Sequence, residues 1–209
     1  MIKILVADDH AILREGLKRI VEGAGLVVVA EAATGHEALE KARETQPDVV
    51  LLDVSMPGKG GLETAQELKE RHPRLRVLML TVHPEDHYAV RCLKGGADGY
   101  LTKDIAASEL VAAIQKVYRG GKYISPTLAE RLAESLGPGF GSAPHEALSN
   151  REFEVLRRIG AGQTVGQIAE ELHLSVKTVS TYRARILEKM NMKTTAEIMR
   201  YAVEQGLGA

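Results

Sequence analysis

Short apolar runs alternate with longer amphipathic segments through the first 121 residues of the chain. Runs at residues 2–7, 26–30, 49–54, 76–81 and 99–102 have the length and composition of buried strands. Each is followed by a segment with apolar residues at helical spacing, as at Leu110, Ala113, Ile114 and Val117. Strands that alternate with helices predict an α/β doubly wound fold, with a five-stranded parallel sheet covered on both faces.

The rest of the chain shows a different pattern. Residues 122–145 are rich in Gly, Pro and Ser and predict a linker, with a short helix around residues 127–136. Helical spacing then returns at residues 149–159, 165–172, 176–190 and 195–204, without a strand pattern. We therefore predict a domain over residues 1–121, a linker over 122–145 and a small all-α domain over 146–209.

Composition narrows the class of protein. Lys and Arg number 27 against 28 Asp and Glu, so the total charge favours no particular partner. Residues 173–193, however, hold five cations and only one acidic residue, Glu188. Cys92 is the single cysteine and cannot form an internal disulfide, and no apolar stretch is long enough to cross a membrane. These features predict a cytoplasmic protein that has no membrane contact.

Charged residues stand where the predicted strands end. Asp8 and Asp9 follow the first strand, Asp53 ends the third, Thr81 closes the fourth, and Lys103 follows the fifth. Ligands of such sheets bind beyond the carboxyl ends of the strands, so these side chains should converge. Three close carboxylates repel one another unless a cation joins them, and oxygen ligands favour Mg²⁺. With an ammonium and a hydroxyl, this set suits the transfer of a phosphoryl group.

The same residues carry a resemblance to a known family. The motifs are ADD at residues 7–9, DVSMPGKGG at 53–61, LT at 80–81 and GADGYLTKD at 96–104. Together they resemble the receiver domain of two-component response regulators, over residues 1 to about 120. The resemblance implies a flavodoxin-like fold and a phosphoryl transfer to Asp53 from a sensor histidine kinase.

The resemblance also implies roles for the other residues of this site. Asp9, Asp53 and the backbone carbonyl of Ser55 would bind Mg²⁺, and Asp8 would assist through water. Thr81 and Lys103 would bind the phosphoryl oxygens, and Tyr100 would rotate as Thr81 moves toward the phosphate. Ser55 and His83 stand two residues beyond Asp53 and Thr81, and we expect them to tune the lifetime of the phosphate.

Two helical patterns near the carboxyl end are separated by only three residues, 173–175, which is the spacing of a helix-turn-helix. Positions on the second helix, residues 176–190, divide between two sides. The side expected to face the core holds Val176, Val179, Ile186, Leu187 and Met190. The other side holds Lys177, Ser180, Thr181, Ala184 and Arg185, which suits entry into the major groove of double-stranded DNA. Arg183 falls within the apolar side, where we expect its head to pair with a carboxylate.

Residues 146–206 resemble the LuxR-type DNA-binding domain, notably in LSNREFEVL, QIAEELHLSVKTVSTY and KMNMKTTAEI. A receiver joined to this domain is similar to the NarL/FixJ type of response regulator. The resemblance implies base contacts from Ser180, Thr181 and Ala184, phosphate contacts from Lys177 and Arg185, and a dimer surface on the last helix. We expect a homodimer when phosphorylated, control of transcription, and RNA polymerase as a further partner.

Two other hypotheses remain open from the sequence. The chain could be an enzyme, a Mg²⁺-dependent phosphatase or phosphotransferase with Asp53 as nucleophile, although it has no cap insertion to form a substrate pocket. It could also be a DNA-binding protein that is regulated by protein contact rather than by phosphate. The response regulator, which is not an enzyme in its own right, is the hypothesis that we favour.

Overall fold

The structure is a computed structural model that describes residues 1–81, 87–126, 128–130 and 143–208. It divides into two compact units, Met1–Ser135 and Leu136–Ala209, which are described separately. Residues 128–130 are helical, and the rest of the short helix predicted around 127–136 lies outside the described residues.

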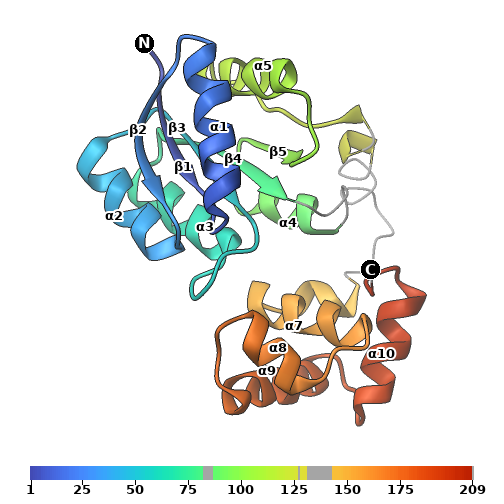
Figure 1. Cartoon of the computed structure of the whole chain (residues 1–209). Coiled ribbons are helices and arrows are strands. Elements are labelled where there is room, and N and C mark those ends of the chain that lie inside the picture. Colours follow the sequence, from blue (N-terminus) through green and yellow to red (C-terminus); the bar gives the residue numbers. More distant parts are fainter. Residues whose placement is uncertain (82–86, 127, 131–142, 209) are drawn as a thin grey trace. The chain divides into compact units, whose positions relative to one another are not determined.

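The first unit contains a five-stranded sheet (Figure 1). Its strands are β1 (Lys3–Ala7), β2 (Val27–Ala32), β3 (Val49–Asp53), β4 (Arg76–Thr81) and β5 (Gly99–Thr102). They run parallel in the order β2-β1-β3-β4-β5, so the chain reverses its winding direction beside β1. The predicted doubly wound sheet is therefore confirmed, and its strand ends differ from prediction by one or two residues at β1, β2 and β3.

Helices cover both faces of this sheet (Figure 1). They are α1 (Ala11–Gly23), α2 (Gly35–Thr45), α3 (Gly61–Arg71), α4 (His87–Lys94) and α5 (Ala107–Tyr118). Helices α1 and α5 pack together on one face, and α2, α3 and α4 follow one another across the other face. Alternate strand residues enter each layer: Ile4 and Val6 point toward α1 and α5 with Leu51 and Leu80.

The core explains the composition of the strands. Strands β1 and β3 are buried on both faces, which is why they have no polar residue before Asp53 in β3 or after Lys3 in β1. On the α1 and α5 side they pack against apolar residues of the helices, namely Val21, Leu110, Ala113, Ile114 and Val117. This rigid centre fixes the carboxyl ends of β1, β3, β4 and β5 relative to one another.

The second unit is helical throughout its described residues. It contains a 3₁₀ turn, η1 (Pro144–Ala147), and helices α7 (Asn150–Gly160), α8 (Val165–Glu171), α9 (Val176–Lys189) and α10 (Thr195–Glu204). Ser149 and Thr164 form capping boxes with Glu152 and Gln167, which satisfy backbone N–H groups at the starts of α7 and α8. The four predicted helices are confirmed, with ends that agree within one residue.

One core prediction in this unit is wrong. Val179 and Ile186 of α9 and Met190 directly after it are buried as expected and Leu187 is half-buried, but Val176 is 56% exposed. Val176 is the first residue of α9, directly after the cap Ser175, so it lies beyond the stripe of α9 that packs against the other helices. A helical repeat identifies a face, but it does not show how far along that face the contact extends.

Candidate functional site

The acidic residues predicted to converge do so at the carboxyl edge of the sheet. Asp8 follows β1 directly and Asp53 is the last residue of β3. Both are buried, whereas Asp9 is partly exposed. Oxygen atoms of Asp8, Asp9 and Asp53, together with a ring nitrogen of His10, all lie within 4.8 Å of one another. The site thus joins two buried carboxylates to two more exposed ligands at the surface.

Lys103 completes the site from the position directly after β5. Its ammonium Nζ lies 2.7 Å from Asp8 Oδ2 and 2.8 Å from Asp53 Oδ2. Both carboxylates are buried, and each of these oxygens forms a short ion pair with the ammonium. One ammonium therefore shares its charge between two carboxylates, and the pocket keeps an excess of negative charge.

Burial and the neighbouring charges leave the pKa values of Asp53 and Lys103 both raised above their ordinary values. Burial raises the pKa of Asp53 to about 6; Lys103 lowers it, and Asp8 adds repulsion that raises it. Burial by itself would lower the pKa of Lys103, but the two carboxylates raise it above its ordinary value. Lys103 therefore stays charged, while Asp53 lacks enough positive charge around it to ionise at its usual pH.

Thr81 and Tyr100 are placed by the two last strands of the sheet. Thr81 ends β4 one residue beyond Leu80, which is the register partner of Asp53, so Thr81 stands beside the acceptor edge. Its carbonyl accepts a hydrogen bond from the Lys103 N–H at 2.6 Å, which ties Thr81 to the strand that carries the ammonium. Tyr100 lies in β5, and its side chain is buried.

The loop after Asp53 folds back on the acceptor. The Ser55 N–H donates to Asp53 Oδ1 at 3.2 Å, and the Gly61 N–H donates to the Val54 carbonyl at 3.0 Å. A Cβ at Gly61 would stand 1.9 Å from the Asp53 carbonyl oxygen, so only glycine permits this approach. Ser55 thus lies next to the carboxylate, and His83 lies outside the described residues.

The donor set fits a magnesium ion. Mg²⁺ prefers oxygen ligands and is commonly held by one or two carboxylates together with water. Asp8 and Asp53 are buried carboxylates that share one ammonium, and Asp9 reaches the same point from the surface. A divalent cation would relieve the repulsion that Lys103 alone leaves uncompensated.

Two residues near this site were not singled out from the sequence. His10 completes the group of possible ligands, and Arg14 of α1 donates from Nη1 to the Asp8 carbonyl at 2.7 Å. His10 directly follows the two aspartates in the sequence, which was an available signal. The contact of Arg14 depends on where α1 begins, so it required the tertiary structure.

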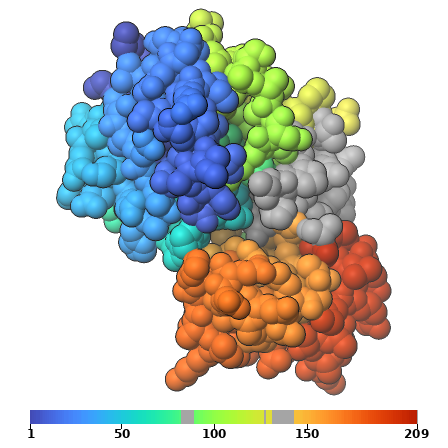
Figure 2. Space-filling view, viewed as in Figure 1, coloured from blue at the N-terminus to red at the C-terminus, as the bar shows by residue number. Residues whose placement is uncertain are grey.

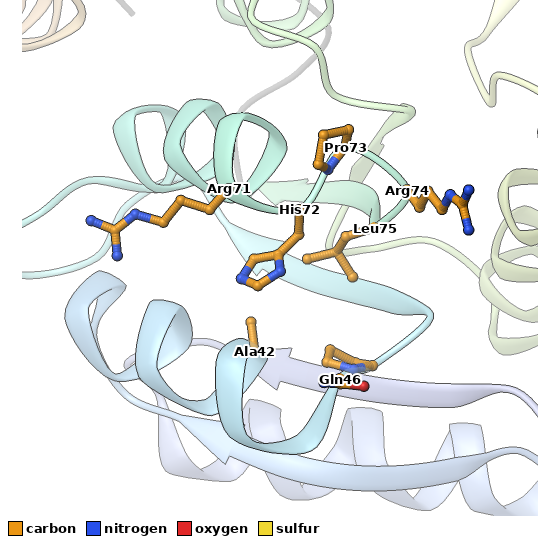
Figure 3. A pocket seen from close by; sticks show the side chains of 8 residues that line it. Ala42, Gln46, Arg71, His72, Pro73, Arg74 and Leu75 are labelled. Carbon is orange, nitrogen blue, oxygen red and sulfur yellow. The ribbon is translucent and has the colours of Figure 1, made fainter.

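The opposite edge of the sheet carries two shallow cavities that share Pro47, Arg74 and Leu75. The first has a volume of about 440 Å³ and lies between the end of α2 and the segment from α3 to β4 (Figure 3). Figure 3 shows Arg71 and Arg74 extending away from each other rather than into the cavity. These cations do not converge as an anion site would require, so the acidic edge remains the candidate site of this unit.

The second unit presents the predicted face of α9. Lys177, Thr181, Ala184 and Arg185 are exposed and Ser180 is partly exposed, as a helix that reads DNA requires. The Thr181 hydroxyl donates to the Lys177 carbonyl at 3.0 Å, which holds its side chain against the helix.

Two other cations of α9 are used inside the unit. Arg183 Nη1 lies 3.3 Å from the Thr195 hydroxyl, and Lys189 Nζ donates to Glu152 at 2.6 Å. The inward position expected for Arg183 is found, but its contact is a hydroxyl rather than the expected carboxylate within the described residues.

Comparison with known proteins identifies both units. Residues 4–115 match the response regulator receiver domain family, and residues 146–202 match the luxR family of bacterial regulatory proteins. The response regulator GacA of Pseudomonas syringae pv. syringae is 44% identical over 99% of this chain and 98% of its own. The response regulator UvrY of Escherichia coli is 40% identical over 99% of this chain and 96% of its own. A crystal structure of the response regulator ChrA, from a heme-sensing two-component system, is 31% identical with a TM-score of 0.54, over 99% of this chain and 98% of that one.

A receiver fold with an acidic pocket, joined to a helix-turn-helix unit, defines the class of DNA-binding two-component response regulators. The chain belongs to the NarL/FixJ type of this family and is similar along its whole length to GacA and UvrY. In the part of the chain that the structure describes, no helix combines the length and apolar character needed to span a bilayer.

Proposed function

We propose that this protein is a transcription regulator controlled by phosphorylation of Asp53. The observation that carries the proposal is the shared contact of the Lys103 ammonium with Asp8 and Asp53, 2.7 and 2.8 Å away, beside the exposed edge that Asp9 forms. A carboxylate held beside a cation and within reach of solvent suits the attack on a phosphoryl group.

The phosphoryl group comes from a phosphohistidine of a sensor kinase. An Asp53 oxygen bonds to phosphorus while the P–N bond breaks, and its electron pair stays with the imidazole. Lys103 then pairs with the phosphoryl oxygens, and the Thr81 hydroxyl donates to one of them. Asp8, Asp9, Asp53 and the Ser55 carbonyl would hold Mg²⁺, which neutralises charge on the group in transfer.

Phosphorylation adds a charge of about −1.5 to −2 at the end of β3, where Lys103 and the metal would offset it. We propose that Thr81 moves toward this charge and that Tyr100, on the adjacent strand, changes its packing as space opens. This change favours a homodimer, in which two α9 helices bind two half-sites on double-stranded DNA. Contact with RNA polymerase would follow from binding at a promoter.

The DNA contacts proposed for α9 follow from exposure and chemistry. Ser180, Thr181 and Ala184 are short and reach base edges, whereas Lys177 and Arg185 are long cations that suit phosphates. Lys189 is excluded from this set because it is paired with the buried carboxylate of Glu152.

Intact mass after incubation with acetyl phosphate and Mg²⁺ tests the acceptor. We expect a gain of about 80 Da, one phosphoryl group, in the wild type and in Asp104→Asn, an exposed aspartate next to Lys103 that serves as control. We expect no gain in Asp53→Asn. A folded wild-type protein that gains no mass, or an Asp53→Asn variant that gains it equally, would overturn the proposal.

A further inference from the structure

His10 adds a nitrogen atom to a pocket whose other ligands are oxygens. Its ring nitrogen Nδ1 lies 2.8 Å from Asp9 Oδ1 and 3.4 Å from Asp8 Oδ1. His10 is the N-cap residue of α1, but its side chain makes no capping hydrogen bond. The imidazole is therefore directed at the carboxylates rather than used to begin the helix.

A mixed nitrogen and oxygen set changes which metal ions the pocket favours. Imidazole suits Zn²⁺, Ni²⁺ and Cu²⁺, whereas Mg²⁺ selects oxygen ligands and keeps much of its water. We propose that His10, with Asp9 and Asp53, makes this pocket a site for a first-row transition-metal ion such as Zn²⁺, in competition with Mg²⁺. This inference rests on the proposed function, because the competing ion would occupy the place that phosphorylation requires.

The geometry permits such a site with small movements. In the tetrahedral geometry of Zn²⁺, two ligands that each lie about 2.1 Å from the ion are about 3.4 Å apart. The ligand atoms here lie within 4.8 Å of one another, so the widest pair must close by at most roughly 1.4 Å. The side chains of His10 and Asp9 are 64% and 31% exposed and can make that movement, while Asp8 and Asp53 stay fixed in the core.

The pocket also keeps a net negative charge that a second cation would neutralise. Lys103 is the one cation that contacts Asp8 Oδ2 and Asp53 Oδ2 among the described residues. Two carboxylates and the nearby Asp9 face a single ammonium, so an added dication meets net negative charge. His10 then decides the kind of dication, because it supplies the nitrogen ligand of the set.

Metal affinities of the full-length protein test the proposal. Zn²⁺ affinity is measured by competition with a coloured chelator, and Mg²⁺ affinity by calorimetry, for the wild type, His10→Asn and His36→Asn. His36 is an exposed histidine on α2 of the same unit and serves as the matched control. For His10→Asn we expect Zn²⁺ binding at least about tenfold weaker, as the loss of a ligand should cost no less than the loss of its supporting partner. Mg²⁺ affinity should change by less than about twofold, since Mg²⁺ does not need the nitrogen.

Two outcomes overturn this inference. If His10→Asn binds Zn²⁺ as the wild type does, His10 is not a ligand. If Zn²⁺ and Mg²⁺ affinities fall together, His10 only orients Asp9. Asp53 labelling by acetyl phosphate in Mg²⁺, measured on the same samples, separates this test from that of the proposed function. Normal labelling without a His10 effect on Zn²⁺ rejects the zinc site alone.

Discussion

At the scale of single residues, the pocket holds a carboxylate where its ionised form is destabilised. Asp53 is buried at the end of β3 beside Asp8, and Lys103 compensates only part of the resulting repulsion. The result is a pKa raised to about 6, above the ordinary value of an aspartate. Because the pocket stabilises the Asp53 anion poorly, binding of a cation or reaction with a phosphoryl group is favourable there.

This pKa predicts how the stability of the receiver varies with pH when no metal is present. Because the folded state holds the Asp53 proton more tightly than the unfolded state, the contribution is favourable below the unfolded pKa. It is lost as pH rises through about 6. The rise of the Asp53 pKa from its ordinary value to about 6 corresponds to about 3 kcal/mol at most.

Thermal unfolding in EDTA measures this effect in the wild type and Asp53→Asn. We expect Asp53→Asn to be the more stable protein at pH about 7.5, with the difference shrinking at pH about 4.5. Added Mg²⁺ should reduce the difference at the higher pH. A difference that stays constant across this range would contradict the assigned pKa.

At the scale of elements, the edge strand β5 is anchored by a buried carboxylate at its amino end. Asp98 accepts a hydrogen bond from the Val77 N–H at 3.0 Å and pairs with Lys69, Arg76 and Lys122. These groups come from α3, from β4 and from the segment after α5. Burial by itself would raise the pKa of Asp98, but these donors together lower it. The carboxylate thus fixes where β5 begins, and with it the position of Lys103 at the other end.

Asp98→Asn is expected to destabilise the receiver without removing the acceptor. We expect a loss of about 2 to 4 kcal/mol in the free energy of unfolding, below the largest values for broken buried pairs because the cations are partly exposed. Since the folded pKa is lowered, this contribution is present above the unfolded pKa and is lost as pH falls.

Urea denaturation followed by circular dichroism checks the loss, with Asp104→Asn as an exposed control. The folded fraction of Asp98→Asn should still be labelled by acetyl phosphate, because Asp98 and Lys103 lie at opposite ends of β5. Equal stability of Asp98→Asn and the control would show that the ion pairs at Asp98 contribute little.

At the scale of the whole molecule, the two units differ in the sign of the charge at their candidate sites. The receiver concentrates acidic groups at one edge of its sheet, and the second unit exposes Lys177 and Arg185 on α9. The total charge is −1, so this division is invisible in the average composition. Figure 2 is coloured by residue number, so the receiver is blue to green and the helical unit is orange to red.

The division predicts a steep dependence of DNA binding on salt. If a dimer neutralises about six phosphates, the slope of log affinity against log salt should be about −5. Lys177→Ala removes one contact from each protomer, so the slope should change to about −3.5. Binding to a selected DNA site, measured over a range of salt concentrations, gives these slopes.

Lys189→Ala is the contrasting variant for this measurement. Lys189 pairs with Glu152 of α7, which is buried, so its loss should lower the stability of the helical unit and leave the salt slope unchanged. If both variants change the slope equally, the assignment of phosphate contacts on α9 is wrong.

The sequence by itself determined the elements and the approximate place of the site. Short apolar runs and period-3.6 patterns depend on neighbours along the chain, which is why five strands and the four carboxyl-terminal helices could be predicted with ends close to those observed. Parallel strands share an edge, so Asp8, Asp53 and Lys103 could be expected to meet once the winding was known.

Only the tertiary structure decided how those residues pair. One ammonium contacts both Asp8 and Asp53, His10 turns toward Asp9, and Val176 lies beyond the packed stripe of α9. These features depend on distances between segments that are far apart in the chain, or on where a packed surface ends. Local sequence patterns show neither these distances nor the end of a packed surface, because side-chain contacts are set by the packing of the whole unit.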